Sequence, residues 1–193
     1  MRKLGLLVCV IALGASFALA QDQEKKPAES PTAAAPAPPV ANQADVASRD
    51  AIMNAIYEVI SGPAGQKRDW NRFLSLFAPG ARLIAVDKNH DGDLVAKVFT
   101  PDDYVKLATP YFDKEGFFER ESSRSLESWA NIEQIFSTYE SRHAASDAKP
   151  FARGINSFQL FNDGKRWWII TIYWQEETAT TPLPKRYLGK KAR

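Results

Sequence analysis

Cysteine is almost absent from this chain, and histidine is nearly as rare. The 193 residues include one cysteine, Cys9, and two histidines. Cys9 lies in an N-terminal segment that we predict to be removed from the mature protein. We therefore expect a mature chain without disulfides, without a thiol nucleophile and without a zinc site built on cysteine.

The N-terminus has the pattern of a secretory signal peptide. Two basic residues, Arg2 and Lys3, precede an apolar run over residues 4–17, and residues 18–20 fit the small-residue rule for cleavage. The apolar run is too short for a good transmembrane helix. We predict a signal peptide at 1–20, a periplasmic or extracellular location, and no stable membrane span after cleavage.

The charges of the remaining chain are balanced. Two of the 25 Lys and Arg residues belong to the predicted signal peptide, so the other 23 equal the 23 Asp and Glu residues. A nucleic-acid binder usually carries a concentrated basic surface. Here the basic cluster lies in residues 181–193, which we interpret as a basic flexible tail. We therefore expect no nucleic-acid partner.

Proline and alanine dominate residues 21–44. Such a segment cannot bury enough apolar surface to fold, so we predict a disordered linker. The folded domain is then expected over residues 45–180. Its first half has the apolar spacing of helices and its second half has runs typical of strands, which predicts an α+β fold.

Helix signals are clear in the first half of the domain. Apolar spacing predicts a helix over 45–61, and Asp69 is a suitable N-cap for a short second helix. A short strand is expected over 81–86. The sequence Thr100-Pro101-Asp102-Asp103 predicts the start of a third helix, because it combines a capping box with proline at the first helical position.

Four strand-like runs fill the second half, over residues 117–129, 132–142, 152–162 and 165–176. Short turns separate them, so we expect antiparallel pairing. The pair Asp163-Gly164 predicts a tight hairpin turn.

The last of these runs is apolar on both faces. Strict alternation places one set of side chains on one face: Trp167, Ile169 and Tyr173. It places a second set on the other: Trp168, Ile170, Ile172 and Trp174. We therefore expect both faces of this strand to be covered, with the C-terminal segment or a second copy of the chain on the outer face.

This order of elements resembles the nuclear transport factor 2-like superfamily, also called SnoaL-like. The resemblance rests on that order, on the turn at residues 77–81, and on Arg-Trp-Trp-Ile-Ile at residues 166–170. It covers residues 45–178. It implies a cone-shaped fold in which three helices of the N-terminal half pack on a curved, mostly antiparallel sheet around a conical pocket.

The superfamily includes isomerases, dehydratases, polyketide cyclases and non-catalytic binding or dimerisation domains, so function depends on the site. Its ketosteroid isomerases use a carboxylate on the first strand and a tyrosine on the first helix. Tyr57 matches the tyrosine, but residues 83–86 offer no carboxylate. Its dehydratases use a histidine in the cavity, and neither His90 nor His143 is well placed. We assign no catalytic residue.

Polar side chains among aromatic strands are the best pocket candidates, because buried polar groups need partners. We predict a pocket that draws on six residues: Tyr57, Trp70, Tyr139, Arg153, Asn156 and Gln159. Arg153 would favour an anionic ligand. The alternatives are an internal network that braces the sheet and, for tryptophan, a place in the core.

Residues 117–126 carry alternating charges. On a regular strand Glu119 and Glu121 share one face, and Arg120 and Arg124 share the other. Paired carboxylates serve acid–base chemistry if one is buried. We expect instead an exposed, charged strand face.

One polar loop resembles a calcium-binding loop. Oxygen-bearing side chains alternate at loop positions 1, 3, 5 and 7: Asp87, Asn89, Asp91 and Asp93. Gly92 occupies position 6, where the turn needs glycine, but position 12 is Val98 in place of glutamate. The alternative is a polar hairpin turn. We expect no other cofactor.

The sequence thus favours a secreted or periplasmic domain that binds a small apolar or weakly anionic ligand in a conical pocket. One alternative is a SnoaL-like isomerase or dehydratase, which would need a carboxylate or histidine on the pocket wall beside Tyr57. The other is a homodimeric protein-interaction module with a filled interior.

Overall fold

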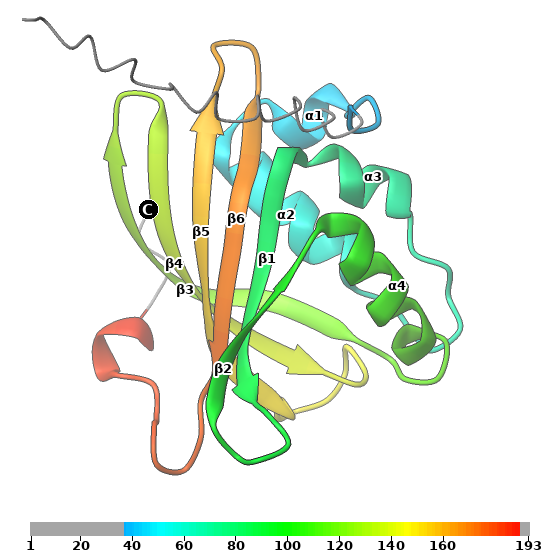
Figure 1. The fold of residues 1–193 in the computed structure, drawn as a ribbon, viewed down its shortest axis with the longest axis vertical. Coiled ribbons are helices and arrows are strands. Elements are labelled where there is room, and N and C mark those ends of the chain that lie inside the picture. The colour runs from blue at the N-terminus through cyan, green and yellow to red at the C-terminus, as the bar shows by residue number, and fades with distance from the viewer. Residues whose placement is uncertain (1–36, 190–193) are drawn as a thin grey trace, which may run out of the picture. The chain divides into compact units, whose positions relative to one another are not determined.

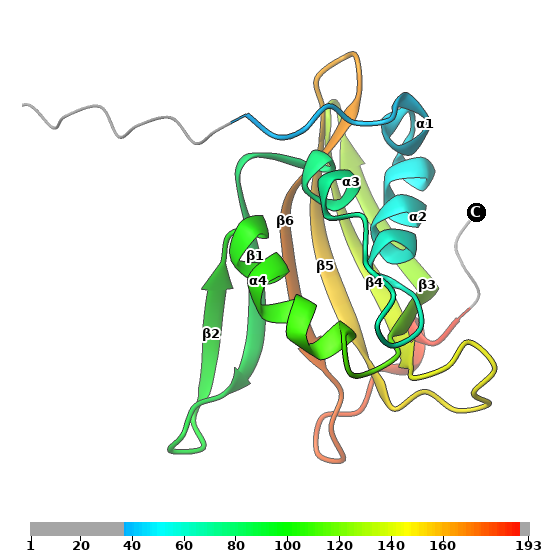
Figure 2. The same cartoon turned by 90° about the vertical axis from the view of Figure 1, so that its right-hand side faces the viewer.

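A curved six-stranded sheet with helices on its concave side forms the protein (Figures 1 and 2). The computed structural model describes residues 37–189. The predicted signal peptide, and the predicted linker up to residue 36, lie outside the described residues. No helix within 37–189 has the length and apolar character needed to cross a membrane.

The sheet is mostly antiparallel. Its strands are β1 (Phe77–Lys88), β2 (Leu94–Phe99), β3 (Phe118–Trp129), β4 (Ile132–Arg142), β5 (Ala152–Asn162) and β6 (Trp167–Glu176). Their order across the sheet is β2-β1-β6-β5-β4-β3, and among the described strands the β1/β6 pair alone is parallel. The predicted α+β class and antiparallel meander of four strands are confirmed.

Within residues 37–189, four α-helices precede or interrupt the strands. They are α1 (Gln43–Val46), α2 (Arg49–Ile60), α3 (Trp70–Ser75) and α4 (Pro101–Phe112). Asp69 caps α3, and Thr100 and Asp103 form the predicted capping box of α4. The single helix expected over 45–61 is two helices instead, because Ser48 leaves the helical conformation and caps α2.

Strand β2 is a correction to the sequence analysis. β1 is longer than predicted and turns back at Asn89–Gly92 to pair with β2 over Leu94–Phe99. The sequence does not predict β2, because its apolar side chains do not alternate between buried and exposed positions. Leu94 is 65% exposed and Val98 58% exposed. A strand with little buried surface leaves no period-2 signal.

The predicted faces of β6 are also corrected. Ile169 and Ile172 both lie in the core on the concave side, whereas Ile170 and Tyr173 are 37% and 45% exposed on the outer side. The register shifts between β5 and β6 at this point, so one extra residue changes the alternation. Ile169 and Ile172 are therefore the buried residues of the strand, and its outer face is partly exposed.

Residues 181–189 lie against the outer face of the sheet, although we predicted a flexible tail from residue 181. This segment contains a short 3-10 helix, η1 (Lys185–Tyr187). The Thr138 hydroxyl donates a hydrogen bond to the carbonyl oxygen of Tyr187 at 2.7 Å. The Tyr187 ring packs on Phe136 at 5.7 Å between centroids. These contacts cover part of the outer face.

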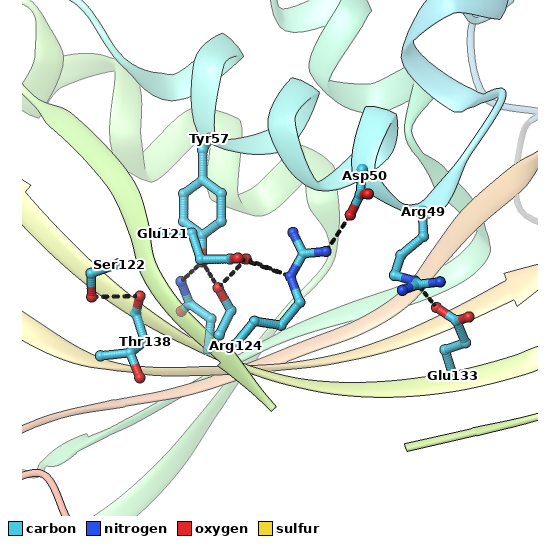
Figure 3. Close-up of polar contacts among 10 residues, drawn as sticks. Arg49, Asp50, Tyr57, Glu121, Ser122, Arg124, Glu133 and Thr138 are labelled. Carbon is cyan, nitrogen blue, oxygen red and sulfur yellow. Dashed lines mark hydrogen bonds and ion pairs between the residues drawn. The ribbon is translucent and has the colours of Figure 1, made fainter. Parts of the chain in front are cut away.

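Ion pairs hold α2 on the sheet. Arg124 on β3 pairs with Glu121 at 2.8 Å and with Asp50 at the start of α2, while Arg49 pairs with Glu133 at 2.9 Å (Figure 3). The side chains of Arg124 and Glu121 are only 9% and 4% exposed. The Glu121–Arg124 pair is therefore largely withdrawn from solvent.

Removal of Arg124 should destabilise the fold strongly. In Arg124→Met, Glu121 stays buried without its cation, so we expect the free energy of unfolding to fall by about 3–5 kcal/mol. Arg120→Met is the matched control on the same strand, because Arg120 is 68% exposed where it pairs with Glu140. It should cost about 1 kcal/mol or less. Urea denaturation measures both, and equal losses would contradict the assigned role of the pair.

Candidate functional site

A cavity of about 400 Å³ lies between the concave face of the sheet and the helices α2 and α4. Aromatic and aliphatic side chains make up most of its wall. Four of the lining residues are well exposed to solvent and mark the mouth: Leu107 and Tyr111 on α4, Phe151 before β5, and Glu176 at the end of β6. The remainder of the wall is largely buried, which is the usual form of a small-molecule site.

Glu119 on β3 provides the charged group inside the cavity. Ser141 Oγ donates a hydrogen bond to Glu119 Oε2 at 2.8 Å, and Asn156 Nδ2 donates to Oε1 at 3.2 Å. Ser61, which follows α2, fixes the backbone at this point, because the Glu119 N–H donates to Ser61 Oγ at 3.0 Å. The carboxyl group is therefore held in place on the cavity wall.

Burial raises the pKa of Glu119 from 4.5 to about 7. The hydrogen bonds from Ser141 and Asn156 favour the ionised form and oppose this shift, but burial is the larger effect. No cation pairs with Glu119 among the described residues, whereas Glu121, two residues away, pairs with Arg124. A carboxyl group with this pKa exchanges its proton near neutral pH.

Tyr57 on α2 lies beside Glu119, and its hydrogen bonds have a defined direction. Ser137 Oγ donates to the ion-paired Glu121 at 2.8 Å, so its single proton is already used. The Tyr57 hydroxyl, 2.6 Å from Ser137 Oγ, must then be the donor of that pair. Tyr57 also accepts from Asn156 Nδ2 at 3.1 Å. Its phenol proton therefore points to Ser137 and away from the cavity.

Comparison with solved structures agrees with this architecture. A protein of unknown function with a cystatin-like fold from Nostoc punctiforme has a TM-score of 0.50 and 11% identity, with 65% of this chain and 86% of that chain covered. The two chains share a curved, mostly antiparallel sheet with helices packed on it. The expected cone-shaped fold is thus confirmed.

Two further structures are similar to this chain. An NTF2-like protein of unknown function from Silicibacter pomeroyi has 14% identity and a TM-score of 0.46, covering 68% of this chain and 94% of its own. A Kribbella flavida protein, provisionally described as a ketosteroid isomerase, has 14% identity and a TM-score of 0.40, with 79% and 95% covered. No family model and no curated protein matches the sequence. At these identities the likeness concerns the fold.

Three of the six predicted pocket residues line the cavity: Tyr57, Tyr139 and Asn156. Tyr139 lies across Gly154 on the next strand, where a Cβ atom would come within 2.6 Å of the phenol oxygen. Glycine at position 154 therefore allows the tyrosine ring to reach the wall.

The other three predicted pocket residues lie elsewhere. Trp70 stacks on Phe112 at 6.0 Å, in the helical layer behind the cavity. Arg153 pairs with Glu177 at 2.5 Å outside the cavity, and Gln159 is exposed on the outer face. Residues 153 and 159 are odd-numbered on β5 whereas Asn156 is even-numbered, so simple alternation already separates them.

The sequence predicts an exposed, charged strand face at Glu119, because charged residues on a strand are usually exposed. Glu119 and Glu121 do share one face, as predicted, but it is the inner face. Arg124 was predicted on the opposite face and lies with them, because an extra residue at Ser122 shifts the register of β3. The clue in the sequence was a pair of carboxylates at alternate positions between aromatic runs.

The proposed calcium loop forms the turn between β1 and β2. Asn89 Oδ1 accepts the backbone N–H groups of Asp91 and Asp93 at 2.9 and 2.8 Å, and Asp87 pairs with Lys97 at 2.6 Å. Within residues 37–189, no group of three or more His, Cys, Asp or Glu side chains is arranged to hold a metal ion. Calcium binding here stays a prediction, and these contacts favour the hairpin turn.

The raised pKa of Glu119 predicts how stability depends on pH. Between pH 4.5 and 7 the folded chain binds a proton that the unfolded chain releases, so stability falls as pH rises through this window. Glu119→Gln removes this dependence. We expect the stability of the wild type relative to the variant to drop between pH 5 and 8, on the order of 1–3 kcal/mol after allowance for water in the cavity.

Urea denaturation at the two pH values measures this difference. Glu127→Gln is the matched control, because Glu127 is an exposed glutamate on the same strand. The free energy of unfolding of Glu127→Gln should change with pH as that of the wild type does. A constant difference between wild type and Glu119→Gln would show that Glu119 titrates normally.

Proposed function

We propose that this nuclear transport factor 2-like domain binds a small, mainly apolar molecule in its cavity. The observation that supports the proposal is an open cavity of about 400 Å³ with an apolar, aromatic wall and one polar corner at Glu119, Asn156 and Ser141. A few fixed polar groups in an apolar cleft are what a site needs to orient a small ligand. The cavity volume argues against the alternative of an interaction module with a filled interior.

The proposed ligand differs in charge from the one expected at first. The argument for an anionic ligand rested on Arg153, which pairs with Glu177 outside the cavity. The charged residues that line the cavity are Glu119 and Glu176. An anionic ligand would meet two carboxylates there, so we propose a ligand without negative charge.

Export of the protein is part of this proposal and rests on the predicted signal peptide at residues 1–20. We also propose that two copies of the chain associate, in addition to ligand binding and not in place of it. The support for this association is the partly exposed apolar side chains of the outer sheet face, such as Ile170 and Tyr173.

Filling the cavity should abolish binding. Ala108 on α4 lines the wall, and Ala108→Phe places a ring in the space that a ligand would occupy. We expect the affinity for the neutral dye N-phenyl-1-naphthylamine, followed by its fluorescence, to fall at least about tenfold. Ala96→Phe is the control, because Ala96 is exposed on β2. Loss of binding in both variants, or in neither, would contradict binding in the cavity.

A second candidate function is acid–base catalysis of the isomerase or dehydratase type. It is favoured by one observation: a carboxyl group with a pKa of about 7 faces an apolar cavity beside Tyr57. Such a group serves as a general base or acid for proton transfer next to a carbonyl group. Glu119 would carry out the transfer, since the Tyr57 proton is committed to Ser137.

Proton exchange tests the catalytic candidate without knowledge of the natural substrate. With 2-tetralone as an apolar ketone in D₂O at pH 7, the wild type should exchange the α-protons at least about a hundredfold faster than buffer. Glu119→Gln should return the rate to that of buffer, and Glu127→Gln should match the wild type. Proton NMR measures the exchange, and a wild-type rate equal to that of buffer would limit the domain to binding.

A further inference from the structure

The charge of the cavity wall is one-sided. Glu119 lies within it and Glu176 at its exposed end, and no Lys, Arg or His is among the described residues that line it. Arg68 lies close by but behind the Phe112 ring, 4.9 Å from its centroid, where its Nη2 donates to the Gly62 carbonyl oxygen at 2.7 Å. Arg68 is thus satisfied by the backbone and does not neutralise the carboxylates.

The wall is also unusually aromatic. Eleven of its 22 residues are Phe, Tyr or Trp, drawn from both helices and from the sheet. Tyr104 on α4 and Tyr139 on β4 line the same cavity as Glu119, and burial, followed by the charge of Glu119, raises the pKa of both phenols. Both therefore stay neutral. Electron-rich ring faces around a carboxylate attract a positive charge by cation–π contact and by ion pairing.

We propose that the cavity takes an apolar organic cation, a hydrophobic amine whose ammonium group pairs with Glu119 while its apolar body lies among the aromatic rings. This inference rests on the proposed ligand-binding function and adds the charge of the ligand. A bare carboxylate in an apolar cavity is unfavourable, and a bound cation removes that cost. A neutral ligand would leave Glu119 to be protonated.

The groups that face Glu119 determine how binding depends on pH. They are Tyr57 on α2, Tyr104 on α4, Tyr139 on β4, Glu176 on β6 and Glu121 on the same strand. The pKa of each tyrosine is raised by burial and by Glu119, and Glu121 is paired with Arg124. Glu119 is ionised above pH 7, so a cation should bind more tightly as pH rises through 7 and should displace a proton when it binds below that pH.

Three probes of one shape test this charge preference: 1-naphthylmethylamine, 1-naphthylmethanol and 1-naphthoate. The alkylammonium group keeps its charge below about pH 9. By isothermal titration calorimetry at pH 8, the amine should bind at least about tenfold more tightly than the alcohol, and the carboxylate most weakly. At pH 5.5 the affinity for the amine should fall by roughly tenfold, while that for the alcohol should not fall.

Variants separate Glu119 from other sources of this pattern. Glu119→Gln should remove both the preference for the amine and its pH dependence, while binding of the alcohol and a normal thermal melt show that the cavity is intact. Glu127→Gln should behave as the wild type. His143 stacks on Phe151 at the mouth, 4.2 Å between centroids, and a pH dependence that arose from it would persist in Glu119→Gln.

Heats measured in two buffers of different ionisation enthalpy should show proton release when the amine binds to the wild type near pH 6. Equal affinities for amine and alcohol, or an affinity for the amine that falls as pH rises, would overturn the inference and leave the proposed binding function standing. Binding of none of the three probes would overturn both.

Discussion

One extra residue in β3 is the constraint on which the candidate site depends. The register shift at Ser122 places Arg124 on the same inner face as Glu121, where regular alternation would have sent it outward. Because Glu121 is ion-paired, it accepts a hydrogen bond from Ser137. Ser137 in turn accepts the proton of the Tyr57 hydroxyl. Without Arg124, the buried Glu121 would lack its cation, and α2 would lose one of the ion pairs that attach it to the sheet.

Two carboxylates on one strand thus have different environments. Glu121 is ion-paired and structural, whereas Glu119 has only neutral hydrogen-bond partners and a pKa of about 7. A buried carboxyl group with a raised pKa and no cationic partner is typical of a site that handles a proton or a charge. Ionisation of Glu119 in an apolar cavity costs stability, and a bound cation would offset part of that cost.

The cavity itself results from the path of the chain around the sheet. Because β1 lies beside β6 and pairs with β2 at the edge, the chain leaves the sheet and returns as α4 on its concave side (Figure 2). The capping box at Thr100 fixes where α4 begins. Tyr104, Ala108 and Tyr111 then line the cavity on the side opposite the curved sheet.

The sequence by itself determined the elements whose signals are local. The caps at Asp69 and Thr100, the hairpin at Asp163-Gly164 and the meander of strands follow from the side chains nearest to them, and they suffice for the α+β class. Tyr57, Tyr139 and Asn156 were also identified, since polar groups among aromatic strands need buried partners.

The tertiary structure alone decided what depends on register and on distant neighbours. The bulge at Ser122 depends on pairing with β4, and no local pattern in β3 marks it. β2 buries too little apolar surface to produce an alternating pattern in the sequence. Arg153 lies outside the cavity because alternation along β5 places its side chain on the other face of the sheet. Glu119 became the central group because a helix and two other strands enclose it, and burial is a property of the fold, which a charged residue in a sequence does not disclose.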